Sequence, residues 1–244
     1  GETGVGKEMF ARWIHDHGPR RDQAFVDLNC AGLTRELLNS ELFGHTRGAF
    51  TGAVTDKRGL LEIAHRGTVF LDEVGDADVE VQPRLLKVLE EKRFRRVGDV
   101  LDRSVDVRLV AATHHDLGQL VEQRRFREDL FYRLSAIPIF VPPLRERPGD
   151  VSLLARALLG RISVEMGFPG IQLFSEAESV LRGYSWPGNI RELRNVLERA
   201  VLLGDRVAVR AADLEEVLTR RRARREQPDM TLEQAERAHI VAVL

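Results

Sequence analysis

The segment GETGVGKE at residues 1–8 constrains this chain more than any other feature, because its glycines have the spacing of a phosphate-binding loop. Gly1, Gly4 and Gly6 allow backbone N–H groups to turn toward an anion, and Lys7 can then reach the outer phosphates. Apolar residues at helical spacing follow the loop, so it should open a helix whose positive end points at the anion. The segment therefore predicts a nucleotide-phosphate site.

A pair of acids farther along the chain offers metal ligands that the phosphate loop lacks. The general loop motif places Ser or Thr after the lysine to hold Mg²⁺, but this chain has Glu8, so part of the metal binding must come from elsewhere. The apolar segment TVFLDE at residues 68–73 ends in two acids, and ligands of parallel sheets bind at the carboxyl ends of strands. Asp72 can hold Mg²⁺, directly or through water, and Glu73 can orient the water that attacks the γ-phosphate. Loop and acids together predict nucleotide hydrolysis.

Short apolar segments alternate with helical patterns in the first part of the chain, which predicts an α/β domain with a parallel sheet. From Val151 onward no strand pattern is obvious, so a second, helical domain is expected. We expect an α/β subdomain over 1–142, a smaller all-helical lid over 143–215 and a basic linker from residue 216. The expected strands of the first part are 25–30, 68–73, 107–113 and 137–141.

Composition narrows the class of protein. A formal net charge of −1 gives no bulk attraction to nucleic acid, although TRRRARRE at 219–226 is either a solvated linker or helix end or a phosphate-contacting patch. No apolar run approaches the roughly 18 residues of a membrane span. The single cysteine, Cys30, allows no internal disulfide and fits a reducing compartment. The seven histidines, with His114 and His115 adjacent and no cysteine cluster beside them, do not have the pattern of a zinc or iron site, so none is expected.

Several segments carry a family resemblance: GETGVGKE, ELFGHTRGAFTGA, TVFLDE, FREDLFYRL, PPLRER and WPGNIREL. With these the chain resembles, over nearly its whole length, the AAA+ domain of bacterial sigma-54-dependent transcriptional activators (enhancer-binding proteins of the NtrC type). The resemblance implies an AAA+ P-loop NTPase fold, with a parallel sheet whose central first strand is missing from this sequence and a smaller helical lid. It also implies a cytoplasmic ATPase that uses ATP and Mg²⁺, and residues 231–244 resemble the start of a Fis-like helix-turn-helix region cut before its recognition helix.

The resemblance also assigns site residues. Asn29 matches an asparagine that holds the catalytic glutamate back, Arg127 and Arg133 match arginine fingers that reach a neighbouring subunit, and Arg191 matches a nucleotide-sensing arginine of the lid. Where the family usually has Thr-Asn, this chain departs with Thr113-His114, although an imidazole can also donate a hydrogen bond. The implied catalytic residues are Glu73, Asp72, Asn29, Arg127 and Arg133. The implied ATP-binding residues are Gly1, Glu2, Thr3, Gly4, Val5, Gly6, Lys7, Glu8, Asp72, Glu73, Thr113 and Arg191, with Asp72 as the Mg²⁺ ligand.

The GAFTGA segment has the most specific match to the family. In that family the segment forms the tip of a loop that is inserted into a helix. This loop presses on sigma-54 bound to RNA polymerase. Its glycines let a loop fold down or rise, Phe50 offers an apolar contact and Thr51 a hydrogen-bonding group; the alternative is that Phe50 is a core residue of a bent strand. The implied contact residues are Gly48, Ala49, Phe50, Thr51, Gly52 and Ala53.

The implied assembly is a homo-oligomeric ring, most simply a hexamer, that reads enhancer DNA through a region beyond this sequence, often as part of a two-component system. No membrane partner is expected. Two other classes remain as alternatives: a DNA-binding repressor of related architecture that lost polymerase activation, and an AAA+ nucleic-acid motor such as a helicase loader. ATP-dependent open-complex formation on a sigma-54 promoter separates all three.

Overall fold

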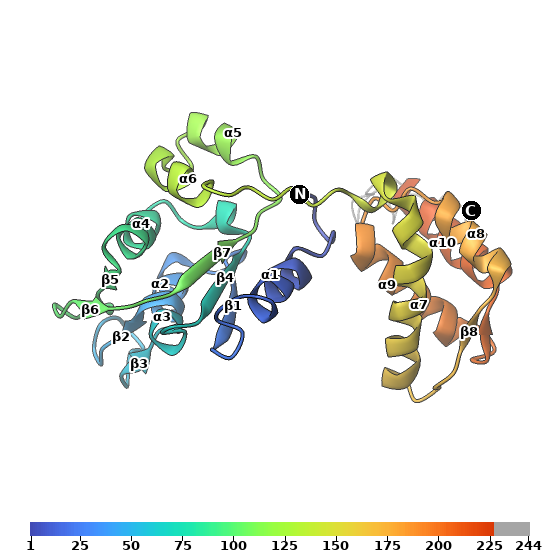
Figure 1. Cartoon of the computed structure of the whole chain (residues 1–244), viewed down its shortest axis with the longest axis horizontal. Coiled ribbons are helices and arrows are strands. Elements are labelled where there is room, and N and C mark those ends of the chain that lie inside the picture. Colours follow the sequence, from blue (N-terminus) through green and yellow to red (C-terminus); the bar gives the residue numbers. More distant parts are fainter. Residues whose placement is uncertain (227–244) are drawn as a thin grey trace, which may run out of the picture. The chain divides into compact units, whose positions relative to one another are not determined.

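The computed structural model describes residues 1–226, with side chains described to residue 219 (Figure 1). The chain forms two compact units, one over Gly1–Pro142 and a second that begins at Pro143. No helix in the described part of the chain combines the length and the apolar character needed to cross a membrane. The expected Fis-like region at 231–244 lies outside the described residues.

A three-stranded parallel sheet organises the first unit, in the order β1-β4-β7. The central strand β4 is buried on both faces except at its last residue, as expected for a strand covered by helices on both sides. Figure 1 shows α1 on one side of the sheet and α2 and α3 on the other. The strands of the sheet are β1 (Phe25–Asn29), β4 (Thr68–Asp72) and β7 (Arg108–Ala111). The helices are α1 (Lys7–Asp16), α2 (Arg35–Phe43), α3 (Leu60–Ile63), α4 (Gln82–Glu91), α5 (Leu117–Glu122) and α6 (Glu128–Leu134), with a 3-10 turn η1 (Val74–Asp76).

The alternation of side chains along β4 divides the core of this unit. Phe70 stacks on Phe25 of β1, and Phe25 in turn contacts His15 of α1, with ring centroids 6.3 and 5.2 Å apart. Val69 and Leu71 point the other way and belong to the apolar core that α2 and α4 complete. Strand register thus places Asn29 opposite Asp72 at the carboxyl edge of the sheet.

The expected strand at 137–141 is wrong, since these residues form no strand. Strands are defined by hydrogen bonds to a neighbour, and β7 pairs only with β4 in the described part of the chain. A pocket of about 610 Å³ lies beside β7 instead, with Ile137, Ile139 and Val141 among its lining residues. The segment has an apolar sequence, but no strand in the described residues pairs with it.

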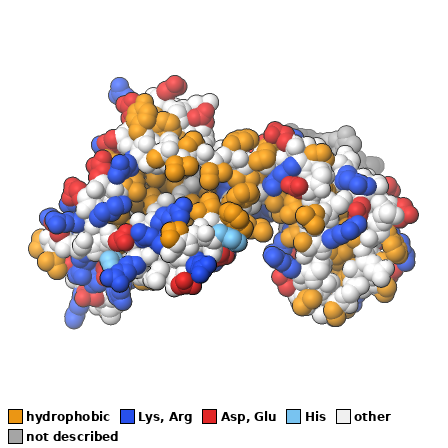
Figure 2. Space-filling view, in the orientation of Figure 1, with side chains coloured by type: hydrophobic (Ala, Val, Ile, Leu, Met, Phe, Trp, Pro, Cys, Tyr) orange, Lys and Arg blue, Asp and Glu red, His pale blue; other side chains and the backbone are white. Residues whose placement is uncertain are grey.

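Two short hairpins lie at the end of the unit away from the phosphate loop (Figure 1). One is β2 (Gly44–His45) with β3 (Lys57–Arg58), and the other is β5 (Arg93–Phe94) with β6 (Arg103–Ser104). Figure 2 shows Lys and Arg side chains gathered over this end. The first hairpin interrupts what would otherwise be one helical region, because α2 runs into β2 and α3 follows β3.

The second unit is helical apart from one short parallel strand pair, which the sequence analysis did not foresee. Its core surrounds the fully buried Trp186, whose indole Nε1 donates to the Leu181 carbonyl at 2.8 Å. The helices are α7 (Pro148–Glu165), α8 (Ser175–Gly183), α9 (Asn189–Leu203) and α10 (Ala211–Glu226), after a 3-10 turn η2 (Leu144–Glu146), and the strands are β8 (Gln172–Leu173) and β9 (Ala208–Val209). The expected lid boundary at residue 215 falls inside α10, and the arginine-rich run continues that helix.

The WPGNIREL segment builds the start of α9. Asn189 is fully buried with a φ of 53°, and its Oδ1 accepts a hydrogen bond from the Leu144 backbone N–H at 2.8 Å. Glu192, also buried, accepts from the Gly188 N–H at 2.6 Å. Asparagine tolerates this left-handed conformation better than most residues and satisfies a backbone donor at the same time. Much of this motif is therefore structural.

Candidate functional site

The phosphate loop leads directly into α1. Gly4 and Gly6 have φ values of 79° and 99°, in the left-handed region that favours glycine. Gly6 is the residue before the helix and Lys7 is its first residue. The loop therefore presents backbone N–H groups at a helix N-terminus, the arrangement that binds phosphate.

Lys7 and Glu73 meet across the site, although 66 residues separate them in the sequence. The Lys7 Nζ lies 3.4 Å from Glu73 Oε1 and donates to the Gly1 carbonyl at 3.1 Å. Glu73 comes directly after β4, is 9% exposed and has a φ of 50°. The carboxyl end of the sheet thus brings the loop and the acids together, as the sequence analysis expected.

The second oxygen of Glu73 is held by His114. Glu73 Oε2 accepts the His114 backbone N–H at 3.0 Å and lies 2.8 Å from the ring Nδ1 of the same residue. Burial alone would raise the pKa of Glu73, but the two His114 hydrogen bonds and the charge of Lys7 outweigh it and hold that pKa below its ordinary value. The carboxylate is therefore ionised at neutral pH, the state that can accept a hydrogen bond from water.

Asp72 offers the oxygen ligands that Mg²⁺ prefers. It is the last residue of β4, its side chain is partly exposed, and its Oδ1 accepts the Glu73 N–H at 3.0 Å. Glu8 does not join it, since its side chain is 61% exposed and lies 4.0 Å from Arg12 on the outer face of α1. Asp72 therefore fits a Mg²⁺ site, and Glu8 does not replace the Ser or Thr of the general motif.

Two expected sensor residues use their polar groups locally. Asn29 Oδ1 accepts the Ala31 N–H at 2.8 Å, so in this state the asparagine is not the partner of Glu73. The Thr113 hydroxyl accepts the His115 N–H at 3.0 Å. His114, which the sequence analysis noted only as a departure from the family, is the residue that contacts Glu73; its identity was visible in the sequence, but the contact depends on where β4 and β7 end.

Of the arginines expected to act on nucleotide, Arg127 and Arg133 bond to groups other than these acids. Arg127, just before α6, forms an ion pair with Asp129 at 2.6 Å. Arg133, near the end of α6, donates to the Leu89 carbonyl at 3.4 Å. Arg191 is exposed in the first turn of α9, in the second unit. Neither Arg127 nor Arg133 contacts Lys7, Asp72 or Glu73 within this chain.

The start of α6 is fixed by Gln82, which no sequence pattern singled out. Gln82 is fully buried at the beginning of α4, and its amide nitrogen donates to the carbonyls of Ala77 and Arg125 at 2.9 and 3.1 Å. Its Oε1 accepts the Arg127 N–H at 2.8 Å. Polar side chains are rarely so buried unless they have hydrogen-bond partners, and the Gln82 amide has them on both its nitrogen and its oxygen. Only the fold could reveal this role, because the partners are up to 45 residues away.

The GAFTGA segment forms a closed turn between β2 and β3. Gly48 and Gly52 have φ values of 79° and 104°, so both need the freedom of glycine. The Gly48 N–H donates to the Ala53 carbonyl at 2.8 Å and closes the turn. The Phe50 ring packs edge-on against His45 at 5.0 Å, half-buried, while Thr51 is exposed. Phe50 is thus neither a core residue of a strand nor fully presented to solvent.

Fold and site together define a P-loop NTPase of the AAA+ class. The chain matches the sigma-54 interaction domain family over residues 1–140 and the AAA+ ATPase lid domain over residues 145–231. It therefore belongs to the sigma-54 interaction domain family.

Characterised proteins of similar sequence are named as transcriptional regulators. The chain is 52% identical over 203 residues to the DNA-binding transcriptional activator HyfR of Escherichia coli, covering 83% of this chain and 30% of HyfR. It is 48% identical over 214 residues to the response regulator protein PilR of Pseudomonas aeruginosa, covering 88% of this chain and 48% of PilR. A crystal structure of NtrX from Brucella abortus in complex with ADP superposes with a TM-score of 0.79 at 38% identity, covering 89% of this chain and 49% of NtrX. The chain spans less than half the length of each.

Proposed function

We propose that this chain is the ATP-hydrolysing module of a sigma-54-dependent transcriptional activator, and that it remodels the closed complex of sigma-54 RNA polymerase into an open complex. The observation that carries the proposal is the contact between Lys7 and Glu73 at 3.4 Å, which joins the phosphate loop to the acid pair in one site. The same unit bears the GAFTGA turn at its far end. The proposed site of ATP hydrolysis and the proposed contact with sigma-54 therefore lie in different parts of the same unit.

The chemistry of the site follows from these contacts. In this state Lys7 is paired with Glu73, and the phosphates of ATP would compete for the lysine because they carry more charge. Glu73 would then keep its bonds to His114 and would be free at Oε1 to orient the attacking water. Asp72 would hold Mg²⁺, directly or through water, and the bound ion would neutralise charge on the phosphates.

The proposed assembly is a ring, most simply a hexamer, with ATP between subunits. Arg127 and Arg133 bond to Asp129 and to the Leu89 carbonyl rather than to Glu73, and an arginine finger supplied in trans would complete the site. Partners of the ring would be sigma-54 with RNA polymerase and, through a region beyond this sequence, enhancer DNA in the cytoplasm. HyfR is named a DNA-binding activator and PilR a response regulator, which supports this assignment.

A single substitution that separates ATP hydrolysis from open-complex formation tests the proposal. Thr51 is exposed on the GAFTGA turn and has no contact with the phosphate loop, so Thr51→Ala should leave phosphate release within about two-fold of wild type. It should nevertheless abolish or strongly reduce open-complex formation with sigma-54 RNA polymerase, because loss of a buried hydrogen bond at each subunit costs about 1 kcal/mol and is repeated around the ring.

The matched control is Thr55→Ala, which removes the same hydroxyl from an exposed position outside the GAFTGA segment. It should affect neither measurement. If Thr51→Ala and Phe50→Ala both support open-complex formation as well as wild type, the GAFTGA turn is not the contact with sigma-54. If wild type hydrolyses ATP but opens no promoter, the repressor or nucleic-acid motor class gains support instead.

A further inference from the structure

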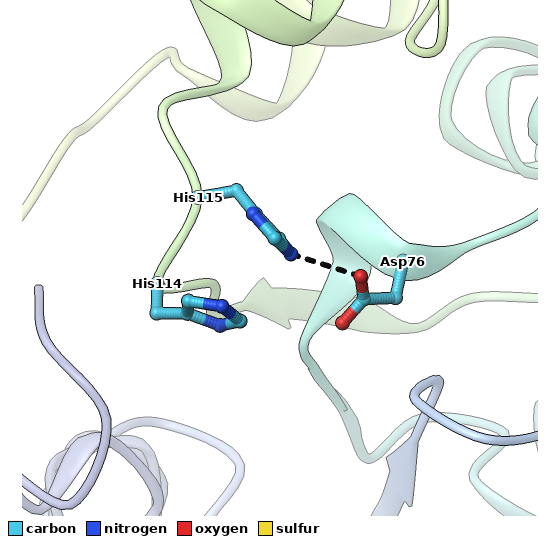
Figure 3. Close-up of side chains that lie close together, drawn as sticks. All are labelled: Asp76, His114 and His115. Carbon is cyan, nitrogen blue, oxygen red and sulfur yellow. Dashed lines mark hydrogen bonds and ion pairs between the residues drawn. The ribbon is translucent and has the colours of Figure 1, made fainter. Parts of the chain in front are cut away.

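Three metal-ligating side chains converge beside the nucleotide site (Figure 3). Asp76 ends η1, directly after the acid pair, and His114 and His115 follow β7. One ligand atom of each residue lies within 4.8 Å of the ligand atoms of the other two. His115 Nε2 is 2.9 Å from Asp76 Oδ1, and the two imidazole rings are 3.9 Å apart at their centroids. No zinc or iron site was expected from the histidine pattern, and Asp76, 38 residues from the nearer histidine, was not considered.

The backbone holds the two segments close together. Gly75 has no side chain, and a Cβ there would lie 2.8 Å from the Thr113 hydroxyl oxygen and 3.1 Å from the His115 ring. The His115 N–H also donates to that hydroxyl at 3.0 Å, which fixes the turn after β7. The approach of Asp76 to His115 is therefore built into both segments rather than made by long flexible side chains.

One ring nitrogen of His114 already has the kind of partner that metal-bound histidines commonly use. Histidine ligands commonly donate the ring N–H that faces away from the metal to a carboxylate, which sets the tautomer and makes the ring a better ligand. Here Nδ1 of His114 lies 2.8 Å from Glu73 Oε2. With the proton on Nδ1, the lone pair of Nε2 is available to a metal. Glu73 thus stands in the position of the outer carboxylate of such a site.

We propose that Asp76, His114 and His115 form a binding site for Zn²⁺ that is distinct from the Mg²⁺ site at Asp72. Two imidazole nitrogens and one carboxylate oxygen form a ligand set that Zn²⁺ accepts, with water as the fourth ligand, whereas Mg²⁺ prefers oxygen ligands alone. Each imidazole binds as a neutral ring with its proton on Nδ1: a doubly protonated ring releases its Nε2 proton to solvent, and a neutral ring protonated on Nε2 releases that proton and takes one up on Nδ1 as the metal–nitrogen bond forms.

Zinc at this site inhibits ATP hydrolysis, an inference that rests on the proposed function. The bound metal fixes the His114 ring, and the polarised Nδ1–H holds Glu73 Oε2 more firmly. The charge drawn toward Oε2 makes the free oxygen Oε1 a weaker acceptor for the proton of the attacking water. The site thereby links the level of available zinc to the rate of the ATPase through one shared carboxylate.

Zinc affinity tests the site independently of catalysis. Zn²⁺ is titrated into the 244-residue chain in competition with a chelating dye, with Mg²⁺ present throughout. One site per chain is expected, weakened about tenfold or more in His115→Ala and in Asp76→Ala. His17→Ala, which removes an exposed histidine stacked on Trp13, is the matched control and should bind as wild type does. Equal zinc affinity in wild type, His115→Ala and Asp76→Ala would overturn the site.

Two further measurements test the coupling between the zinc site and Glu73. Glu73→Gln should weaken zinc binding by about 10- to 100-fold, as loss of an outer carboxylate does elsewhere. Zinc should inhibit phosphate release by wild type at the concentrations that fill the site, and His115→Ala should hydrolyse ATP without that inhibition. Unchanged zinc affinity in Glu73→Gln, or equal inhibition of His115→Ala, overturns the link. Absence of hydrolysis by zinc-free wild type would instead refute the proposed function and leave the zinc affinities as the test of the site.

Discussion

Glu73 is the residue on which most of the site depends, because both of its oxygens are occupied. Lys7 holds one and His114 the other, so the carboxylate connects the phosphate loop to the end of β7. The left-handed backbone at Glu73, with a φ of 50°, costs about 1 kcal/mol or more. Such strain beside a nucleotide site is consistent with a functional position.

We expect Glu73→Gln to keep ATP binding and to reduce its hydrolysis by about 100-fold or more, because an amide is a poor acceptor for the proton of the attacking water. Binding should change little, since it depends on the loop amides and Lys7. Phosphate release and the affinity for a fluorescent ATP analogue measure the two effects. Glu80→Gln makes the same change at an exposed acid paired with Arg35 and should leave both values unchanged. Turnover within a few-fold of wild type would remove Glu73 from catalysis.

The pH dependence of hydrolysis should report the contact with His114. Glu73 acts as a carboxylate, so hydrolysis is lost as the pH falls through its pKa, and the hydrogen bonds and charge from His114 hold that pKa low. In His114→Ala the pKa of Glu73 should therefore rise, and the acidic limb of the kcat profile should move to higher pH. His115→Ala, which does not touch Glu73, should keep the wild-type limb. A limb that stays in place in His114→Ala would show that this histidine does not set the protonation of Glu73.

At the scale of elements, sequence reasoning succeeded where one local pattern decides the structure. The helix after the glycine-rich loop, β4 and α6 were expected from apolar residues at helical spacing, an apolar run and helical periodicity, and each is present. Sequence reasoning failed where the structure of a segment depends on a partner far along the chain. The segment at 137–141 has the sequence of a strand but no strand beside it, and Gln82 owes its role to backbone groups far along the chain. The cluster of Asp76 with two histidines was invisible for the same reason.

The elements under the GAFTGA turn are joined by one nearly buried ion pair. Glu62 of α3 accepts two hydrogen bonds from Arg96, at 2.6 and 2.7 Å, and the two side chains are 14% and 11% exposed. We expect Glu62→Gln to lower the free energy of unfolding by about 1.5–3 kcal/mol, since it weakens charged hydrogen bonds away from water. Chemical denaturation measures the loss. Asp102→Asn, at the more exposed pair with Arg95, should cost clearly less, because solvent screens that pair. Equal losses would show that burial of the Glu62 pair adds nothing.

The same pair predicts a pH dependence of stability. Hydrogen bonds from Arg96 hold the pKa of Glu62 below its ordinary value of 4.5, despite the opposing effect of burial. A carboxyl whose folded pKa is lowered stabilises the fold at pH values above its unfolded pKa, and this stabilisation is lost as the pH falls toward the folded value. The stability difference between wild type and Glu62→Gln should therefore be full at pH 7 and shrink below about pH 4.5. A difference that is constant from pH 7 to pH 3 would contradict this assignment.

At the scale of the whole molecule, the two arginines expected to act between subunits differ in how firmly they are held within their own chain. Arg127 is engaged by Asp129 at 2.6 Å, whereas Arg133 has only a weak hydrogen bond to the Leu89 carbonyl at 3.4 Å. Arg133 is therefore easier to redirect to a neighbouring subunit. If it acts there as a finger, its removal should reduce hydrolysis by about 1,000-fold or more, and Arg127→Ala should cost less.

Mixing two inactive variants tests whether Arg133 acts between subunits. In a ring assembled from Arg133→Ala and Glu73→Gln chains, one type of interface combines the intact Glu73 of one chain with the intact Arg133 of its neighbour. Hydrolysis should therefore reappear in the mixture at a level set by the fraction of such interfaces, with a maximum at intermediate ratios. Labelled chains first establish that the two variants assemble together. If a mixed ring shows no recovery at any ratio, each site is complete within one chain, and Arg133 must reach Lys7 and Glu73 of its own subunit through a rearrangement of α6.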